Sequence, residues 1–293
     1  MRTPPHAGAR RSLRRWFEPR RTAYPWRDVD PDPYRVLVSE VMLQQTQAAR
    51  VAPAFVRFTA RFPTVLTLAS APRSEVVRAW DGLGYNRRAV ALSEAARRIV
   101  RDHGGSVPAD PATLQALPGV GPYTAAAVAA IAFGVPVPAI DTNVRRVVAR
   151  ARLGREPSDV GAEEVRAAAA AWLDPGDPGT WNQAVMDLGR VVCTPKPRCD
   201  ACPIASRCRL TKSGSDATRT PQRRQGPFEG SSRQARGLVV RALRRRAATP
   251  AALSDDTGLA PDRVADAVRA LVRDGVVHVT PGPPSDWVVR LAD

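Results

Sequence analysis

The stretch that decides the fold is LPGVGPYTAAAVAAIAFG, residues 117–134. Glycines and a proline separate two helical segments, and Pro122 suits the first turn of the second helix, where its missing N–H is not needed. Gly119 and Gly121 carry no side chain, so their backbone N–H groups can approach a phosphate closely. An ordinary turn between two helices is the alternative interpretation of the same residues.

The charge of the chain favours the phosphate interpretation. Lys and Arg total 44 against 28 Asp and Glu, a formal net charge of +16, which points to a polyanionic partner, nucleic acid ahead of membrane lipid. The basic first residues lead into no apolar stretch long enough for a signal sequence or a membrane span. We therefore expect a cytoplasmic protein.

Helical patterns punctuated by Gly and Pro run from Pro33 to about Ala151 without paired strands, so we expect a mainly α body. We predict helices over residues 34–48, 51–60, 74–80, 87–103, 112–117, 123–132, 143–152, 162–172 and 181–192. The polar segment 211–230 predicts a linker. Helices near 235–245, 250–258 and 261–274, followed by the strands VVHVT and DWVVRLA, predict a small winged-helix-like α+β module.

All four cysteines lie close together in the chain, as Cys193, Cys199, Cys202 and Cys208 of CTPKPRCDACPIASRC. A disulfide scaffold would spread its bridges through the fold, so this spacing indicates a metal centre. Zinc is one candidate, although zinc ribbons normally supply two separate CxxC pairs and only one is present here. We expect the metal centre to shape a basic loop that could face phosphates.

Two acids are candidates for chemistry: Glu40 in VLVSEVMLQQTQ and Asp141 in AIDTNVRRVVAR. Hydrolysis of a glycosidic bond needs one protonated acid for the leaving group and one carboxylate near the developing oxocarbenium ion, and this pair would fit. The alternatives are a solvated helix acid for Glu40 and, for Asp141, a cap on the helix that begins near Asn143.

In their order along the chain, these segments resemble the helix-hairpin-helix glycosylases with a Gly/Pro-Asp loop, and the MutY adenine glycosylases in particular, over residues 12–210. The resemblance rests on YPWR (24–27), DPYRVLVSEVMLQQTQ (32–47), RFPT (61–64), WDGLGY (80–85), LPGVGPYTA (117–125), DTNVRRV (141–147), WNQAVMDLG (181–189) and the cysteine run. It implies two helical lobes with DNA and an adenine pocket between them. We place a six-helix barrel lobe at 34–145, a cluster lobe at 1–33 plus 146–210, the linker at 211–230 and the module at 231–293.

The resemblance implies a base-excision-repair enzyme that hydrolyses the N-glycosidic bond of adenine mispaired with 8-oxoguanine or guanine. Glu40 matches the general acid that protonates the flipped adenine at N7, and Asp141 matches the aspartate that stabilises the sugar cation or its adduct. Tyr123 occupies the position where lyase-active relatives carry a Schiff-base lysine, and Asn143 matches a residue that positions the acids and water. Schiff-base chemistry needs an amine, and no lysine lies near these residues, so we expect simple hydrolysis.

The resemblance also implies the remaining contacts. The residues that line the adenine pocket are Trp26, Arg27 and Gln183; those that wedge the duplex or touch the opposite purine are Gln45, Thr46 and Leu83; and the four cysteines hold a [4Fe–4S] cluster. The expected partner is double-stranded DNA with a mismatched adenine, bound by a monomer without a membrane. Binding should be mostly electrostatic and weaken with salt.

Three alternatives stay open. A glycosylase of the same fold could remove thymine or uracil instead, although QQTQ at 44–47 and Gln183 favour adenine. A non-enzymatic DNA-binding regulator would not need both acids. The region after about residue 230 is too short for the Nudix-like domain with which longer family members read 8-oxoguanine, so the module could add duplex affinity or act as a stabilising cap.

Overall fold

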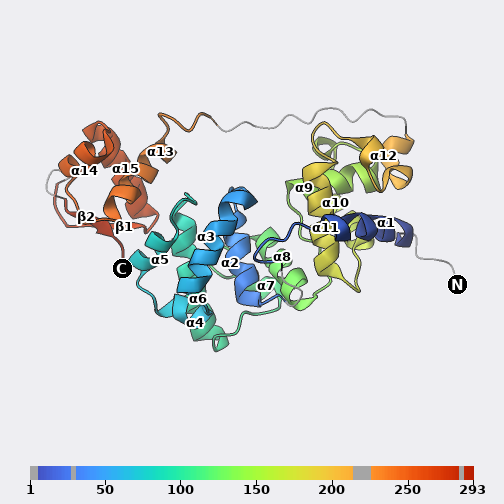
Figure 1. The fold of residues 1–293 in the computed structure, drawn as a ribbon, viewed down its shortest axis with the longest axis horizontal. Helices are drawn as coiled ribbons and strands as arrows, with labels where there is room; N and C mark the ends of the chain where they lie inside the picture. The colour runs from blue at the N-terminus through green and yellow to red at the C-terminus, as the bar shows by residue number, and fades with distance from the viewer. Residues whose placement is uncertain (1–5, 28–30, 214–225, 284–286) are drawn as a thin grey trace. The chain divides into compact units, whose positions relative to one another are not determined.

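The computed structural model describes residues 6–27, 31–213, 226–283 and 287–293, and it is mainly helical, as predicted (Figure 1). Its helices are α1 (Ala7–Phe17), α2 (Pro33–Leu43), α3 (Ala48–Arg61), α4 (Val65–Ser70), α5 (Arg73–Ala79), α6 (Arg87–His103), α7 (Pro111–Gln115), α8 (Pro122–Phe133), α9 (Thr142–Val148), α10 (Ala162–Trp172), α11 (Pro178–Val191), α12 (Arg209–Lys212), α13 (Ser232–Leu243), α14 (Pro250–Thr257) and α15 (Pro261–Arg273). Two strands follow, β1 (Val277–Val279) and β2 (Val289–Leu291). Among these described helices, none combines the length and the apolar character that a membrane span needs.

Most helices lie within a few residues of their predicted bounds, but two predicted helix ends need correction. Helix α2 ends at Leu43 instead of residue 48, because Gln45 adopts a left-handed φ of 57° that no helix accommodates. Helix α9 ends at Val148 instead of residue 152, and residues 149–153 form a π-helical turn closed by Gly154. Three helices, α1, α4 and α12, were not predicted from the sequence.

By contacts, the chain groups into two compact units. Residues 1–40, 108–116 and 120–223 form the first, and residues 41–107, 117–119 and 224–293 form the second. The lobe boundaries, 34–145 for one lobe and 1–33 plus 146–210 for the other, stay a prediction. Most of the predicted linker, residues 214–225, lies outside the described residues.

Helix α11 is the centre of the first unit, where it packs against α1, α8 and α9. The aromatic part of this core is a T-shaped pair, Trp172 and Trp181, with ring centroids 5.5 Å apart. Gly189 allows α11 to approach α9 closely, since a Cβ at this position would lie 2.7 Å from the Cβ of Asn143. The two helices therefore bring residues far apart in the sequence to one place.

In the second unit, α6 packs against α4 and α5, and Phe58 makes edge-to-face contacts with Phe62 and Trp80. The C-terminal module is the predicted three helices and antiparallel hairpin, with Val277 opposite Leu291 and Val279 opposite Val289. A bridge between Ala248 and Val289 adds a third short segment to this sheet.

Candidate active site and cysteine loop

Helix α2 buries Glu40. Asp32 begins the helix, since its Oδ1 accepts from the backbone N–H groups of Tyr34 (2.7 Å) and Arg35 (3.1 Å). The helix is apolar around most of its circumference, and it leaves Glu40 only 6% exposed, with no hydrogen-bond partner for Oε2 among the described residues. Burial raises the pKa of Glu40 to about 7; the charge of Asp141 adds to the shift, while the Tyr123 hydroxyl and then Arg27 oppose it. Glu40 is therefore a carboxyl group that exchanges its proton near neutral pH.

Asp141 performs the capping role that we considered for it. Its Oδ1 accepts from the backbone N–H of Val144 (2.7 Å) at the start of α9, and its Oδ2 accepts from the amide of Asn143 (2.7 Å). Burial raises the pKa of Asp141, and both of these hydrogen bonds oppose the shift because they favour the carboxylate. Since the charge of Asp141 also acts on Glu40, the cap does not exclude a role in the site.

Tyr123, in the first turn of α8, completes this group of buried side chains. Its hydroxyl donates to Sδ of Met186 at 3.5 Å. Burial, followed by the charges of Glu40 and Asp141, raises the pKa of Tyr123 well above its ordinary value, so the phenol is neutral. The structure thus brings together Tyr123, Glu40, Asp141 and Asn143, the four residues to which the resemblance gives catalytic roles.

Arg27 has a partner that the sequence analysis missed. Its guanidinium forms a two-point ion pair with Asp187, 160 residues away, at 2.9 Å (Nη1–Oδ2) and 3.2 Å (Nη2–Oδ1). Tyr24 lies under the guanidinium at 5.3 Å and stacks on Trp26 with ring centroids 4.8 Å apart. One turn before Asp187 on α11, the buried Oε1 of Gln183 has no hydrogen-bond partner within the part of the chain that the structure describes. Asp187 lies one turn after Gln183 on α11, and this spacing was the one sequence signal that could have pointed to Asp187.

A line of hydrogen bonds runs from the active-site carboxylate to the cysteine loop. Asn143 donates to Asp141, and the Oδ1 of Asn143 accepts from Arg146 Nη2 at 2.9 Å. Arg146 also donates to the carbonyl oxygens of Gly189 (2.7 Å) and Cys193 (2.6 Å). The backbone of the first cysteine and the side chain of Asp141 are therefore held by the same network.

The predicted DNA-contacting residues of the second unit surround a buried arginine that we had not singled out. Arg88 donates to the carbonyl oxygens of Val41 (3.0 Å) and Met42 (2.7 Å) at the end of α2, to Thr46 Oγ1 (3.0 Å) and to the Leu83 carbonyl (3.1 Å). Burial lowers its pKa to about 10, so the side chain stays charged at neutral pH. Arg88 thereby ties the 44–46 turn to the 83–85 turn.

The other predicted DNA contacts differ in exposure. Gln45 is exposed, whereas Leu83 is buried. The role of Leu83 as a wedge in the DNA duplex therefore stays a prediction. Gly119 has a left-handed φ of 76°, and its carbonyl accepts from Gln44 Nε2 at 3.1 Å. A Cβ at Gly121 would meet no atom within 4 Å, so open space lies beside this part of the hairpin.

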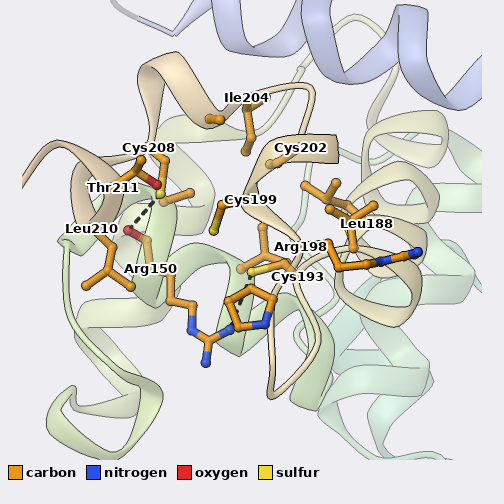
Figure 2. Close-up of a pocket in the computed structure, with 15 residues that line it drawn as sticks. Arg150, Leu188, Cys193, Arg198, Cys199, Cys202, Ile204, Cys208, Leu210 and Thr211 are labelled. Carbon is orange, nitrogen blue, oxygen red and sulfur yellow. Dashed lines mark hydrogen bonds between the residues drawn. The ribbon is translucent and has the colours of Figure 1, made fainter. Parts of the chain in front are cut away.

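All four cysteines line one cavity that is partly open to solvent (Figure 2). Apolar side chains, among them Leu188, Val192 and Ile204, form much of the remaining wall. Burial raises the pKa of the Cys193 thiol, while Arg150, whose Nη1 lies 3.8 Å from its sulfur, opposes the shift. Within the described residues, no three His, Cys, Asp or Glu side chains form a single-ion site. Four thiols around a common cavity are a donor set for a metal centre.

Similarity to known proteins agrees with this geometry. Residues 38–175 match the model of the HhH-GPD superfamily of base excision DNA repair proteins. A solved thermostable thymine-DNA glycosylase is similar with a TM-score of 0.65 and 29% identity, covering 70% of this chain and 95% of that one. An endonuclease III in a non-covalent DNA complex is similar with a TM-score of 0.59 and 25% identity, covering 73% of this chain and 99% of that one. Fold and site define a DNA glycosylase of this superfamily.

Relatives with similar sequences show to which family of DNA glycosylases the chain belongs. An adenine DNA glycosylase of Mycobacterium tuberculosis is 43% identical over 238 residues, which are 80% of this chain and 77% of that protein. The adenine DNA glycosylase of Homo sapiens is 44% identical over 211 residues, 68% of this chain and 39% of the human protein. The chain belongs to the adenine DNA glycosylase family, and its predicted resemblance to MutY-type enzymes is confirmed.

Proposed function

We propose that this chain hydrolyses the N-glycosidic bond of adenine mispaired with 8-oxoguanine or guanine in double-stranded DNA. The observation that carries the proposal is the state of Glu40, a buried carboxyl group with a pKa of about 7 and, among the described residues, one unpartnered oxygen beside the partly buried carboxyl group of Asp141. An acid of this kind can donate its proton to a leaving base at neutral pH.

The two carboxyl groups divide the reaction between them. Glu40 gives its proton to N7 of the flipped adenine, the bond between the base and C1′ breaks, and the bonding electron pair leaves with the base. Asp141, held by Val144 and Asn143, stabilises the positive charge that develops on the sugar. Water then adds to C1′ and gives its proton to a carboxylate. Tyr123 offers no amine for a Schiff base, so the product is an abasic site without strand cleavage.

Recognition of the base would use the other group of buried side chains. Trp26 and Arg27 form one side of the proposed pocket, and the ion pair with Asp187 fixes the guanidinium. The unpartnered Oε1 of Gln183 is an acceptor suited to the amino group of adenine. Extrusion of the base from the stack costs a few kcal/mol, and a mispair reduces that cost. Gln45, Thr46, Leu83 and the glycines of the hairpin would hold the duplex.

We propose a [4Fe–4S] cluster for the cysteine cavity, held by Cys193, Cys199, Cys202 and Cys208 and serving to shape the loop around it. The loop would then present basic side chains to the backbone of DNA, namely Lys196, Arg198, Arg207 and Arg209. Iron and acid-labile sulfide analysis of the purified protein distinguishes the cluster from zinc. Acting on genomic DNA, the protein would work as a monomer in the cytoplasm, at the nucleoid.

The test is single-turnover release of adenine from duplexes that carry it opposite 8-oxoguanine, guanine or cytosine, with Glu40→Gln as the control. We expect release opposite the two purines only, and none from the variant. If a preparation with bound iron releases no adenine, the proposal fails, and thymine and uracil mismatches become the next substrates because a thymine-DNA glycosylase shares the fold. A DNA-binding regulator would have no release for Glu40→Gln to remove.

A further inference from the structure

The C-terminal module is attached to the segment that precedes the 81–85 loop. Arg244 forms an ion pair with Asp81 and donates to the carbonyl of Val77 at 3.4 Å, while its own carbonyl accepts from Arg78 Nε at 3.4 Å. The Arg244 side chain is only 16% exposed. A guanidinium buried at a contact and supplied with these partners marks a defined docking of the module.

A second contact lies on the other side of this loop. Gly275, between α15 and β1, lies next to Val90 of α6: a Cβ added at Gly275 would be in ordinary van der Waals contact, 3.6 Å, with a Val90 methyl group. Strand β2 packs against α5. The module therefore contacts both helices that flank residues 80–86, and all of these residues belong to one compact unit.

Three exposed arginines lie at this junction, one from α5 and two from the module. Arg78, Arg241 and Arg245 are exposed and form no ion pair within the described part of the chain. Arg241 lies one turn before Arg244, and Arg245 directly follows Arg244. Most other arginines of the module have acidic partners, in the pairs Arg236–Asp274, Arg246–Asp256, Arg269–Asp266 and Arg290–Asp293. Unneutralised positive charge thus collects where the module meets α5.

We propose that Arg78, Arg241 and Arg245 form a surface, here called the junction patch, that binds the sugar-phosphate backbone of the duplex beside the mismatch. The location rests on the proposed function, which places the neighbouring 81–85 loop on DNA. Guanidinium groups bind phosphate oxygens through paired, charge-assisted hydrogen bonds. Helix α15, the third helix of the module, carries Arg263, Arg269 and Arg273 as well as Asp262 and Asp266. In the proposed arrangement the junction patch adds affinity through the sugar-phosphate backbone, which positions a protein on DNA without reading its sequence.

The experiment compares the full chain with the double variant Arg241→Gln/Arg245→Gln, using a long mismatched duplex and one that ends close to the mismatch. For the long duplex, we expect the dissociation constant to rise about tenfold and the salt slope of log K to become shallower by about 2, the value for two lost phosphate contacts. Only a small effect is expected for the short duplex. Arg269→Gln/Arg290→Gln removes the same charge from paired positions of the module and should leave both quantities near their starting values.

Each further outcome is decisive. Arg241→Lys/Arg245→Lys keeps the charge and should restore most of the affinity; a loss that lysine does not restore would assign the arginines to packing and overturn the inference. Unchanged affinity and salt slope in the glutamine variant, with adenine still released, would reject the junction patch and leave the glycosylase function intact. If the glutamine variant binds the duplex more weakly than the native chain but no form of the protein releases adenine, the junction patch is supported and the proposed glycosylase function is rejected.

Discussion

Glu40 shows how the position of one side chain creates its chemistry. The residue lies near the end of a buried helix, and the loss of solvation there raises the pKa of its carboxyl group from 4.5 to about 7. The nearby carboxylate of Asp141 raises it further, while the Tyr123 hydroxyl and Arg27 hold the shift in check. The same burial that makes the acid reactive also makes its ionised form costly to the fold.

The first prediction concerns the dependence of catalysis on pH. In the proposed reaction the protonated form of Glu40 is the active form, so single-turnover adenine release should be constant at low pH and fall about tenfold per pH unit above the pKa of about 7. The measurement is a series of rates from about pH 6 to about pH 9 with saturating enzyme. A rate that does not change across this range would remove Glu40 as the proton donor.

The second prediction concerns stability. The pKa of Glu40 is higher in the folded chain than in the unfolded chain, so from about pH 4.5 to about pH 7 unfolding is favoured progressively because only the unfolded state loses the proton. Glu40→Gln removes this penalty and should raise the free energy of unfolding by about 3 kcal/mol at pH 8, with little change at pH 4. Denaturant unfolding at both pH values measures it. The exposed Glu163→Gln should show no such difference, and equal effects of Glu40→Gln at both pH values would contradict the argument.

At the scale of single elements, the hairpin between α7 and α8 needs its two glycines for different reasons. Gly119 has a φ of 76°, and a Cβ there would lie 2.7 Å from Ala91. Gly121 has an ordinary φ of −86° at the start of α8 and open space around it. One glycine is therefore required by the fold, and the other is free for a ligand.

This difference gives the third prediction. Gly119→Ala should destabilise the chain by about 2 kcal/mol or more, since it combines backbone strain with a close contact. Gly121→Ala should leave the melting temperature nearly unchanged and yet weaken binding to DNA, because a methyl group would keep phosphate from the backbone N–H. Thermal unfolding and duplex affinity separate the two effects; normal binding by Gly121→Ala would exclude close phosphate approach at this residue.

A fourth prediction concerns the two turns held by Arg88. Arg88→Met keeps the bulk of the side chain but leaves the carbonyl oxygens of Val41, Met42 and Leu83 without their donor. We expect a loss of about 3 kcal/mol or more in stability and slower adenine release, with Arg88→Lys intermediate because an ammonium group cannot span both turns. Equal rates for the lysine variant and the native chain would show that one turn suffices.

At the scale of the whole molecule, the first unit combines the active site and the cysteine loop in one structure. Cys193, Cys202 and Cys208 pack against its hydrophobic core, and Arg146 connects the backbone of Cys193 to Asn143. Disturbance of the cysteine loop should therefore reach both the core and the catalytic carboxylate.

The fifth prediction follows from that arrangement. Cys202→Ala should abolish the bound iron and lower the melting temperature on the order of 10 °C, because the binding energy of a structural metal centre is folding energy. Adenine release should fall with it. Iron content, thermal unfolding and single-turnover rates test this prediction together. A variant with no iron and an unchanged melting temperature would show that the loop is stable without its cofactor.

Local features of the sequence determine most of the helices and the chemical candidates. Apolar periodicity and the Gly and Pro positions locate α6, α8 and α10 to within a residue or two, because such patterns reflect interactions within one helix. Helix α1 was missed although Ala9, Leu13 and Phe17 form a buried stripe, since its many arginines obscure a pattern that only burial against α11 explains. The acids and the cysteines were identified by residue type and spacing.

Tertiary structure alone decided how those candidates are tuned. The partnership of Arg27 with Asp187 spans 160 residues, and the carbonyl oxygens around Arg88 come from two separate turns, so no local pattern encodes either one. The pKa of Glu40 depends on desolvation by the surrounding fold, on a hydrogen bond from Tyr123 and on the charges of Asp141 and Arg27, which come from other segments of the chain. Sequence supplies the functional groups; burial and long-range contacts, which exist only after folding, determine their protonation and their partners.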